Sequence, residues 1–299
     1  MYWLGAVFPA VKRYRLPLTR DQLMMLMMAV NLLFLGLDTW LAHNISGTIT
    51  PNEWIPIVFG TAAGLLLLFA GLVALKNRPL ATVIATLTLL GSIAVGLLGA
   101  YFHFIRAILP DAPAGQQVTV DLLVWAPPIL GPLMFAIVGI LGMSAAWVED
   151  PPDSGMLVLL GGRKLQLPYS KTRAYFYIIG MASLATVISA VLDHARLNFA
   201  NPWLWLPTAV GVFATVVAVG LGAIETPSRG DLLTYIAAML VMIAVGVVGA
   251  VLHYQSDLTA GGAFVAERFV RGAPILAPML FANVGLLGLI VLLDPREQR

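Results

Sequence analysis

The chain has 299 residues, of which 60% are hydrophobic and 11% are charged, and its mean hydropathy is +0.90. A soluble domain carries about 25% charged residues, so this chain has too few polar side chains to cover a globule in water. A lipid bilayer is therefore the expected solvent. The chain contains no cysteine, which excludes disulfides and thiolate-bound clusters and leaves histidine, methionine and carboxylates as metal ligands.

Residues 1–22 place basic residues beside aromatic ones, which is typical of an amphipathic segment lying on the membrane surface. Four apolar stretches follow, each about 20 residues long, which is the length that a helix needs to cross the hydrocarbon. We expect these spans at about residues 23–43, 54–75, 80–104 and 128–148, which form a first module over residues 23–148.

Residues 149–173 interrupt the apolar pattern and are expected to form a cytoplasmic hinge. A turn-rich stretch precedes a predicted hairpin, whose strands lie at residues 156–160 and 163–167 around Gly161-Gly162. Four further spans are expected at about residues 174–198, 203–224, 232–253 and 274–293, within a second module over residues 174–299.

Two stretches of the chain read almost alike. Residues 93–103 are IAVGLLGAYFH and residues 243–253 are IAVGVVGAVLH. Farther along, Pro-Ile-Leu-Gly-Pro at 128–132 is echoed by Pro-Ile-Leu-Ala-Pro at 274–278. An even number of spans per module gives both copies the same orientation. The sequence therefore predicts an all-α integral membrane protein of eight transmembrane helices, built as a tandem parallel repeat of two four-helix modules.

The basic residues predict the orientation. One side of the membrane receives thirteen of them: Lys12, Arg13, Arg15, Arg20, Lys76, Arg78, Arg163, Lys164, Lys171, Arg173, Arg229, Arg296 and Arg299. The other side receives four: Arg106, Arg196, Arg268 and Arg271. By the positive-inside rule both termini and the hinge are cytoplasmic, and we expect the protein in the cytoplasmic membrane of a bacterium.

All four histidines fall at the predicted outer ends of odd-numbered spans: His43, His103, His194 and His253. Each module contributes two, from its first and its third helix. Two imidazoles that face each other across a helix pair can ligate one haem iron or share a copper or zinc ion. The alternative is that each histidine is an amphipathic residue at the membrane interface, and this alternative is weakest for His103 and His253, which close the repeated motif.

Two carboxylates and two arginines accompany these histidines. Asp38 and Asp193 lie near the outer ends of their helices and are predicted to orient an imidazole through its other ring nitrogen. Arg106 and Arg196 follow His103 and His194 closely, and could offset haem propionates through charge-assisted hydrogen bonds. For the carboxylates the alternatives are proton transfer, cation binding or exposure to interfacial water, and for the arginines the alternative is plain charge balance within the loops.

The methionine-rich run of the first span is predicted to pack in the protein core. Met24, Met25, Met27 and Met28 lie near the cytoplasmic start of this span, far from the histidines, so packing is favoured over copper binding.

Three functional hypotheses follow. The leading one is a subunit of a redox complex that carries b-type haem on the four histidines and passes electrons between an outer-side carrier and a quinone or a partner subunit. The second is a structural membrane anchor in a larger complex. The third is a metal or solute binding and transport protein that uses the same His/Asp cluster. Haem b is the expected cofactor, and the alternatives are copper or no cofactor.

The expected partners are other membrane subunits and lipids, with a quinone and an outer-side electron carrier under the redox hypothesis, and no nucleic acid. No motif in the sequence predicts a catalytic site.

Overall fold

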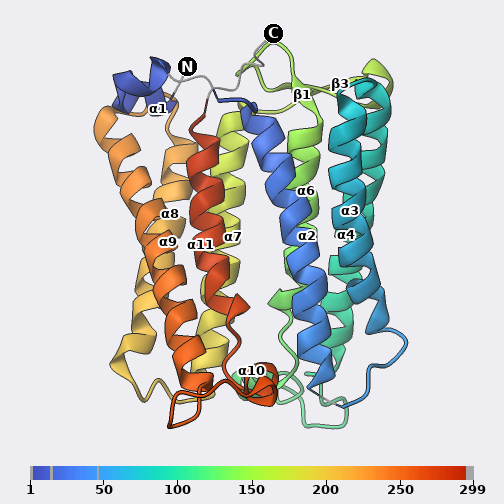
Figure 1. The fold of residues 1–299 in the computed structure, drawn as a ribbon, viewed down its shortest axis with the longest axis vertical. Helices are drawn as coiled ribbons and strands as arrows, with labels where there is room; N and C mark the ends of the chain where they lie inside the picture. The colour runs from blue at the N-terminus through green and yellow to red at the C-terminus, as the bar shows by residue number, and fades with distance from the viewer. Residues whose placement is uncertain (1–2, 14–15, 46, 294–299) are drawn as a thin grey trace.

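The computed structural model describes residues 3–13, 16–45 and 47–293, which fold into an upright bundle of α-helices (Figure 1). Six helical segments are long and apolar enough to cross a bilayer, so the chain is an integral membrane protein. They are α2 (Arg20–Asn44), α3 (Trp54–Ala74), α4 (Arg78–Ile105), α7 (Lys171–Ala195), Pro202–Ala223, which contains α8 (Trp205–Ala223), and α9 (Arg229–Asp257).

Two further apolar helices are shorter. α6 (Leu130–Ala146) has 17 residues and α11 (Leu276–Val291) has 16. At 1.5 Å per residue each is about 25 Å long, slightly less than the hydrocarbon thickness. Length and composition therefore support six of the eight predicted spans. The predicted fourth and eighth spans correspond to the shorter helices α6 and α11.

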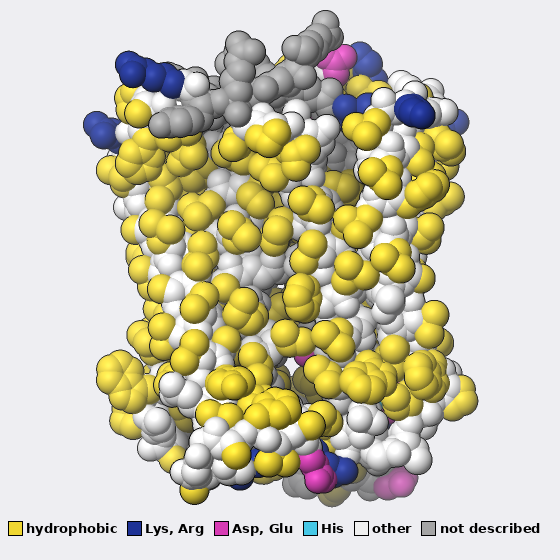
Figure 2. Space-filling view, in the orientation of Figure 1, with side chains coloured by type: hydrophobic (Ala, Val, Ile, Leu, Met, Phe, Trp, Pro, Cys, Tyr) yellow, Lys and Arg dark blue, Asp and Glu magenta, His cyan; other side chains and the backbone are white. Residues whose placement is uncertain are grey.

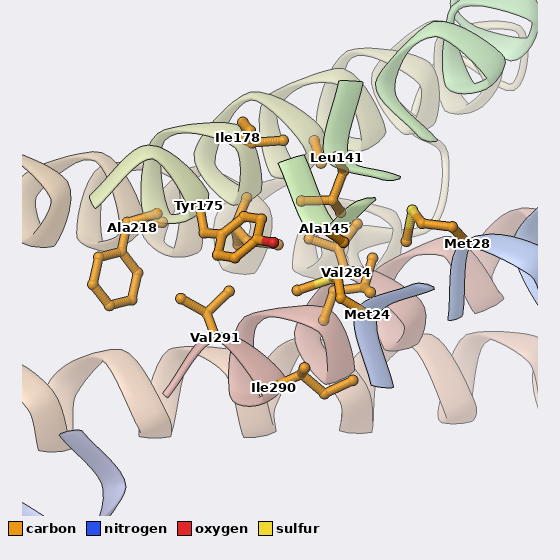
Figure 3. Close-up of a cluster of buried hydrophobic side chains, with 14 of the residues drawn as sticks. Met24, Met28, Leu141, Ala145, Tyr175, Ile178, Ala218, Val284, Ile290 and Val291 are labelled. Atoms are coloured by element: carbon orange, nitrogen blue, oxygen red, sulfur yellow. The ribbon is translucent and has the colours of Figure 1, made fainter. Parts of the chain in front are cut away.

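The first and second halves of the chain lie side by side, and α2 and α6 of the first half face α7 and α11 of the second (Figure 1). Met24 and Met28 of α2 are fully buried in the apolar cluster at this junction (Figure 3). Packing, as predicted, is thus the role of these two methionines. The flanks of the bundle are covered by apolar side chains (Figure 2), as expected of a surface that faces lipid.

One end of the bundle carries a small antiparallel sheet, and we call it the sheet end (top of Figure 1). The predicted hairpin is present as β2 (Met156–Val158) and β3 (Lys164–Gln166). A strand that the sequence analysis missed, β1 (Val148–Glu149), pairs with β2. On the face shown in Figure 2, the visible Lys and Arg side chains gather mainly at this end.

The short helices α1 (Trp3–Val7) and η1 (Pro9–Arg13) also lie at the sheet end (Figure 1). The amide of Leu4 donates to the carbonyl of Leu292 at 3.0 Å, and Val7 is buried. This part of the predicted surface segment therefore packs on the end of α11. Residues 1–2, 14–15 and 294–299, which include both predicted cytoplasmic termini and Arg15, Arg296 and Arg299, lie outside the described residues.

The opposite end contains the loops that follow α4 and α9, and we call it the histidine end. Two short helices interrupt these loops, α5 (Val120–Trp125) and α10 (Ala266–Arg271), and neither was predicted. Each loop leads into a pair of prolines, of which the first (Pro128 or Pro274) precedes α6 or α11 and the second (Pro132 or Pro278) lies in its first turn.

The repeated glycines produce matching close helix contacts in the two halves. A Cβ atom at Gly99 would lie 2.8 Å from Cβ of Pro132, and one at Gly249 would lie 2.8 Å from Cβ of Pro278. The absence of a side chain thus lets α4 approach α6, and α9 approach α11, at corresponding positions.

Candidate functional site

His103 and His253 make the same hydrogen bond in the two halves. Nδ1 of His103, near the end of α4, lies 2.9 Å from the carbonyl oxygen of Pro128, and Nδ1 of His253, in the last turns of α9, lies 2.9 Å from that of Pro274. A carbonyl oxygen can only accept, so Nδ1 carries the proton in both rings. In the neutral imidazole the lone pair is then on Nε2.

His43 lies beside His103. Its Nδ1 donates to the carbonyl of Thr39, one turn earlier in α2, at 2.8 Å. The ring centroids of His43 and His103 are 6.1 Å apart, and the planes meet at 62° in an edge-to-face contact. The structure therefore brings together the first of the two predicted imidazole pairs.

The second pair is arranged differently. His194 and His253 are close enough for their charges to interact, and the His194 ring also meets the edge of Phe199 at 6.1 Å. Phe199 stacks in turn on Trp205 at 4.2 Å. Nδ1 of His194 is buried and makes no well-formed hydrogen bond, although the backbone of Leu204 lies nearby. His194 therefore lacks the backbone anchor that holds the Nδ1 atoms of the other three rings.

Asp38 and Asp193 are half-buried on α2 and α7. Asp193 lies 3.8 Å from Nη1 of Arg196, as an ion pair one turn apart. The Nδ1 atoms of His43, His103 and His253 are held by carbonyl oxygens. In these three rings the backbone, and not Asp38 or Asp193, orients the imidazole.

Arg196 joins the two halves of the chain. Its Nε donates to the carbonyl of Val124 at 2.8 Å and its Nη2 to that of Ala126 at 3.1 Å. These carbonyls lie at the C-terminal end of α5, where the helix leaves its last acceptors without internal donors. The guanidinium predicted to meet a haem propionate therefore already holds α5 against α7.

Arg106 has a looser environment. Its side chain is 58% exposed and lies 3.8 Å from Oε1 of Glu53, whose own side chain is largely buried. Glu53 also accepts from the amide of Thr50 at 2.8 Å. Arg106 therefore balances the charge of Glu53 across two loops, and its guanidinium stays accessible from solvent.

A cluster of buried charges that was not predicted from the sequence lies at the sheet end. Lys171 at the start of α7 is fully buried, pairs with Asp21 of α2 and donates to the carbonyl of Trp147 at 2.8 Å. Arg20, 2% exposed, donates to Thr172 at 2.7 Å. The available signal in the sequence was the position of charged residues next to predicted helix starts, but the orientation rule explains the basic ones without any buried pairing.

Glu149 completes this cluster from the hinge. One carboxylate oxygen accepts the amides of Gly155 at 2.7 Å and Lys171 at 2.9 Å, and the other accepts the amide of Asp153 at 2.9 Å. The hydroxyl of Tyr175 donates to Asp21 at 3.2 Å. The hinge is therefore fastened to both halves of the bundle by buried polar contacts.

Among residues 3–13, 16–45 and 47–293, no group of three or more His, Cys, Asp or Glu side chains has the geometry of a metal site. The chain matches no protein-family model, no curated protein and no solved structure. Haem, copper, a quinone and an outer-side electron carrier stay predictions.

Proposed function

We propose that the protein is a structural subunit of a larger membrane complex, an anchor formed by eight spans in two tandem four-helix modules. The matched contacts of Gly99 with Pro132 and of Gly249 with Pro278 support the repeat. The even number of spans and the excess of basic residues at the sheet end support an orientation with both termini in the cytoplasm of a bacterial cell.

A single observation carries the anchor function: three of the candidate site residues, His103, His253 and Arg196, hold the protein's own backbone. His103 and His253 bind the carbonyls that precede α6 and α11, and Arg196 binds those that end α5. Groups used in this way stabilise a helical scaffold, and its apolar flanks are the surface that partner subunits would meet within the bilayer.

Purification from native membranes in a mild detergent tests this function. The anchor function expects the full chain to elute with other subunits in a fixed stoichiometry, measured by native mass spectrometry, and the complex to survive the double substitution His103→Asn and His253→Asn. A chain that elutes alone from every mild detergent, under conditions that keep other membrane complexes intact, would refute it.

The second candidate function is electron transfer through b-type haem, favoured by the fixed ring tautomers. Ligating histidines usually donate their other ring nitrogen to a carbonyl or carboxylate, as His103 and His253 do, so Nε2 is the atom that would bind iron. The edge-to-face contact of His43 and His103 would have to open for both rings to point at one iron.

The reduced-minus-oxidised spectrum separates the two functions. Haem binding requires an α-band of b-type haem in the wild-type protein and its loss when His103 and His253 are both replaced by Asn, which keeps a donor but removes the ring lone pair. If the wild-type protein purified from native membranes shows no such band, the haem function is excluded and only the anchor function stands.

A further inference from the structure

The carbonyls that His103 and His253 bind lack their usual helical partner. Helical backbone angles begin at Ile129 (φ −62°, ψ −33°) before α6 and at Ile275 (φ −61°, ψ −33°) before α11. The carbonyl of the residue before each, Pro128 or Pro274, would normally accept the amide four positions later. That position is occupied by a proline, Pro132 or Pro278, which has no N–H.

What remains inside the helix is a weaker bond. The amide three positions after Pro128, that of Gly131, lies 3.3 Å from its carbonyl, and the amide of Ala277 lies 3.2 Å from that of Pro274. These are long contacts of the 3₁₀ type. The shorter hydrogen bond to each carbonyl, at 2.9 Å, comes from a histidine of the neighbouring helix.

We propose that His103 and His253 donate the hydrogen bond that Pro132 and Pro278 cannot make, and thereby fix where α6 and α11 begin. The partners are 25 residues apart in the first half and 21 in the second. Because the connecting loops differ in length while the bond does not, loop geometry does not dictate the bond. This role rests on the same two hydrogen bonds that support the anchor function, but it concerns only the helix starts and requires neither a partner subunit nor haem.

The surroundings explain what the substitute donor does. Pro128 and Pro274 are both exposed residues at the loop end of the bundle, so water can also solvate their carbonyls. The histidine adds a fixed direction, because its hydrogen bond holds each carbonyl toward the neighbouring helix. The prolines four positions later pack on Gly99 and Gly249, so their rings contribute to the close helix contact. Each proline ring thus packs against a glycine of the neighbouring helix but provides no backbone N–H, and the histidine supplies a donor in its place.

A double-mutant cycle tests this role in the purified full-length protein. His103→Ala removes the donor and is expected to lower the apparent melting temperature by about 2–6 °C. His103→Asn is expected to retain most of the stability, because its amide nitrogen occupies a place close to Nδ1. His103→Gln, whose amide lies one bond farther out, is expected to resemble His103→Ala.

Pro132→Ala supplies the rescue. It restores an amide at position 132 and keeps the Cβ atom that meets Gly99, so the loss caused by His103→Ala is expected to fall by at least half in this background. The matched control is Pro278→Ala, which is expected to rescue His253→Ala but not His103→Ala. If His103→Ala yields no folded protein, recovery of folded yield by Pro132→Ala is the readout.

Equal losses from His103→Ala with and without Pro132→Ala would overturn the proposed role, as would a rescue by the proline of the wrong half. So would a failure of Pro132→Ala to restore folded yield when Pro132→Ala alone folds. None of these results depends on a partner subunit or on pigment, so failure of the anchor or haem proposal is measured separately.

Discussion

The two ends of the bundle use polar side chains in different ways. At the sheet end Arg20 and Lys171 are buried, and both pair with the largely buried Asp21, so that Lys171 of the second half is tied to α2 of the first. At the histidine end His103 and His253 are half-buried and bond to backbone carbonyls. The charges at the sheet end depend on one another, whereas each histidine serves one backbone acceptor.

The difference has an energetic consequence. Removing one member of a buried charge cluster leaves its partners charged, desolvated and unpaired, which is costly. Removing a donor from one carbonyl leaves a single neutral group unsatisfied, which costs less. Substitutions at the sheet end should therefore destabilise the protein more than those at the histidine end.

The largest effect is expected from Lys171→Met. The substitution leaves Asp21 without its cation and the Trp147 carbonyl without its donor. We expect the free energy of unfolding in mixed micelles to fall by about 3–5 kcal/mol. Lys164→Met on the exposed strand β3 is the control, and a similar loss in both variants would contradict the contrast between the ends.

Glu149→Gln should have the next largest effect. The carboxylate accepts three backbone amides, and the neutral amide offers only one oxygen acceptor in its place. We expect a loss of about 2–3 kcal/mol in the same unfolding measurement. Glu225→Gln is the matched control because its side chain is 85% exposed. An unchanged stability for Glu149→Gln would show that the hinge is not held by this carboxylate.

Arg196→Ala tests the histidine end. It removes two hydrogen bonds to carbonyls at the end of α5 and should cost about 1–2 kcal/mol. Protease cleavage in the loop containing α5 should also become faster, because α5 loses its tie to α7. Arg271→Ala, at an exposed side chain paired with exposed Glu267, should change neither readout. A loss as large as that of Lys171→Met would erase the contrast between the ends.

The smallest effect is expected from Arg106→Ala. Its ion pair with Glu53 is long and more than half exposed on the arginine side, so the loss should stay below about 1 kcal/mol. The same variant also tests the haem hypothesis. If Arg106 paired with a haem propionate, its removal would shift the reduction potential of the bound haem. A large loss of stability would mean that this exposed pair behaves like the buried cluster.

Much of the helical architecture could be predicted from the sequence. The expected span at 54–75 is α3 (Trp54–Ala74), and the expected span at 80–104 is α4 (Arg78–Ile105). Long apolar stretches in lipid have little choice but to form helices, because no other structure satisfies the backbone within one segment. The short helices α5 and α10 escaped prediction, since segments of six residues carry too little pattern.

The sequence also placed the four histidines near helix ends but could not say what they touch. His103 and His253 each contact a proline carbonyl. This could not be predicted without knowing which loop returns to which helix. The pairing of Arg20 with Thr172, which are 152 residues apart, is likewise invisible in local patterns.

By itself the sequence determined the solvent of this protein, the positions of its long helices and the doubling of its glycine–histidine motif, because hydrophobicity and helix length are local properties. Only the tertiary structure decided which polar groups meet, since hydrogen bonds and ion pairs form between residues far apart in the chain. Each donor in the folded bundle needs an acceptor, and for half-buried His103 that acceptor is a carbonyl whose α-helical donor position is occupied by a proline on another helix.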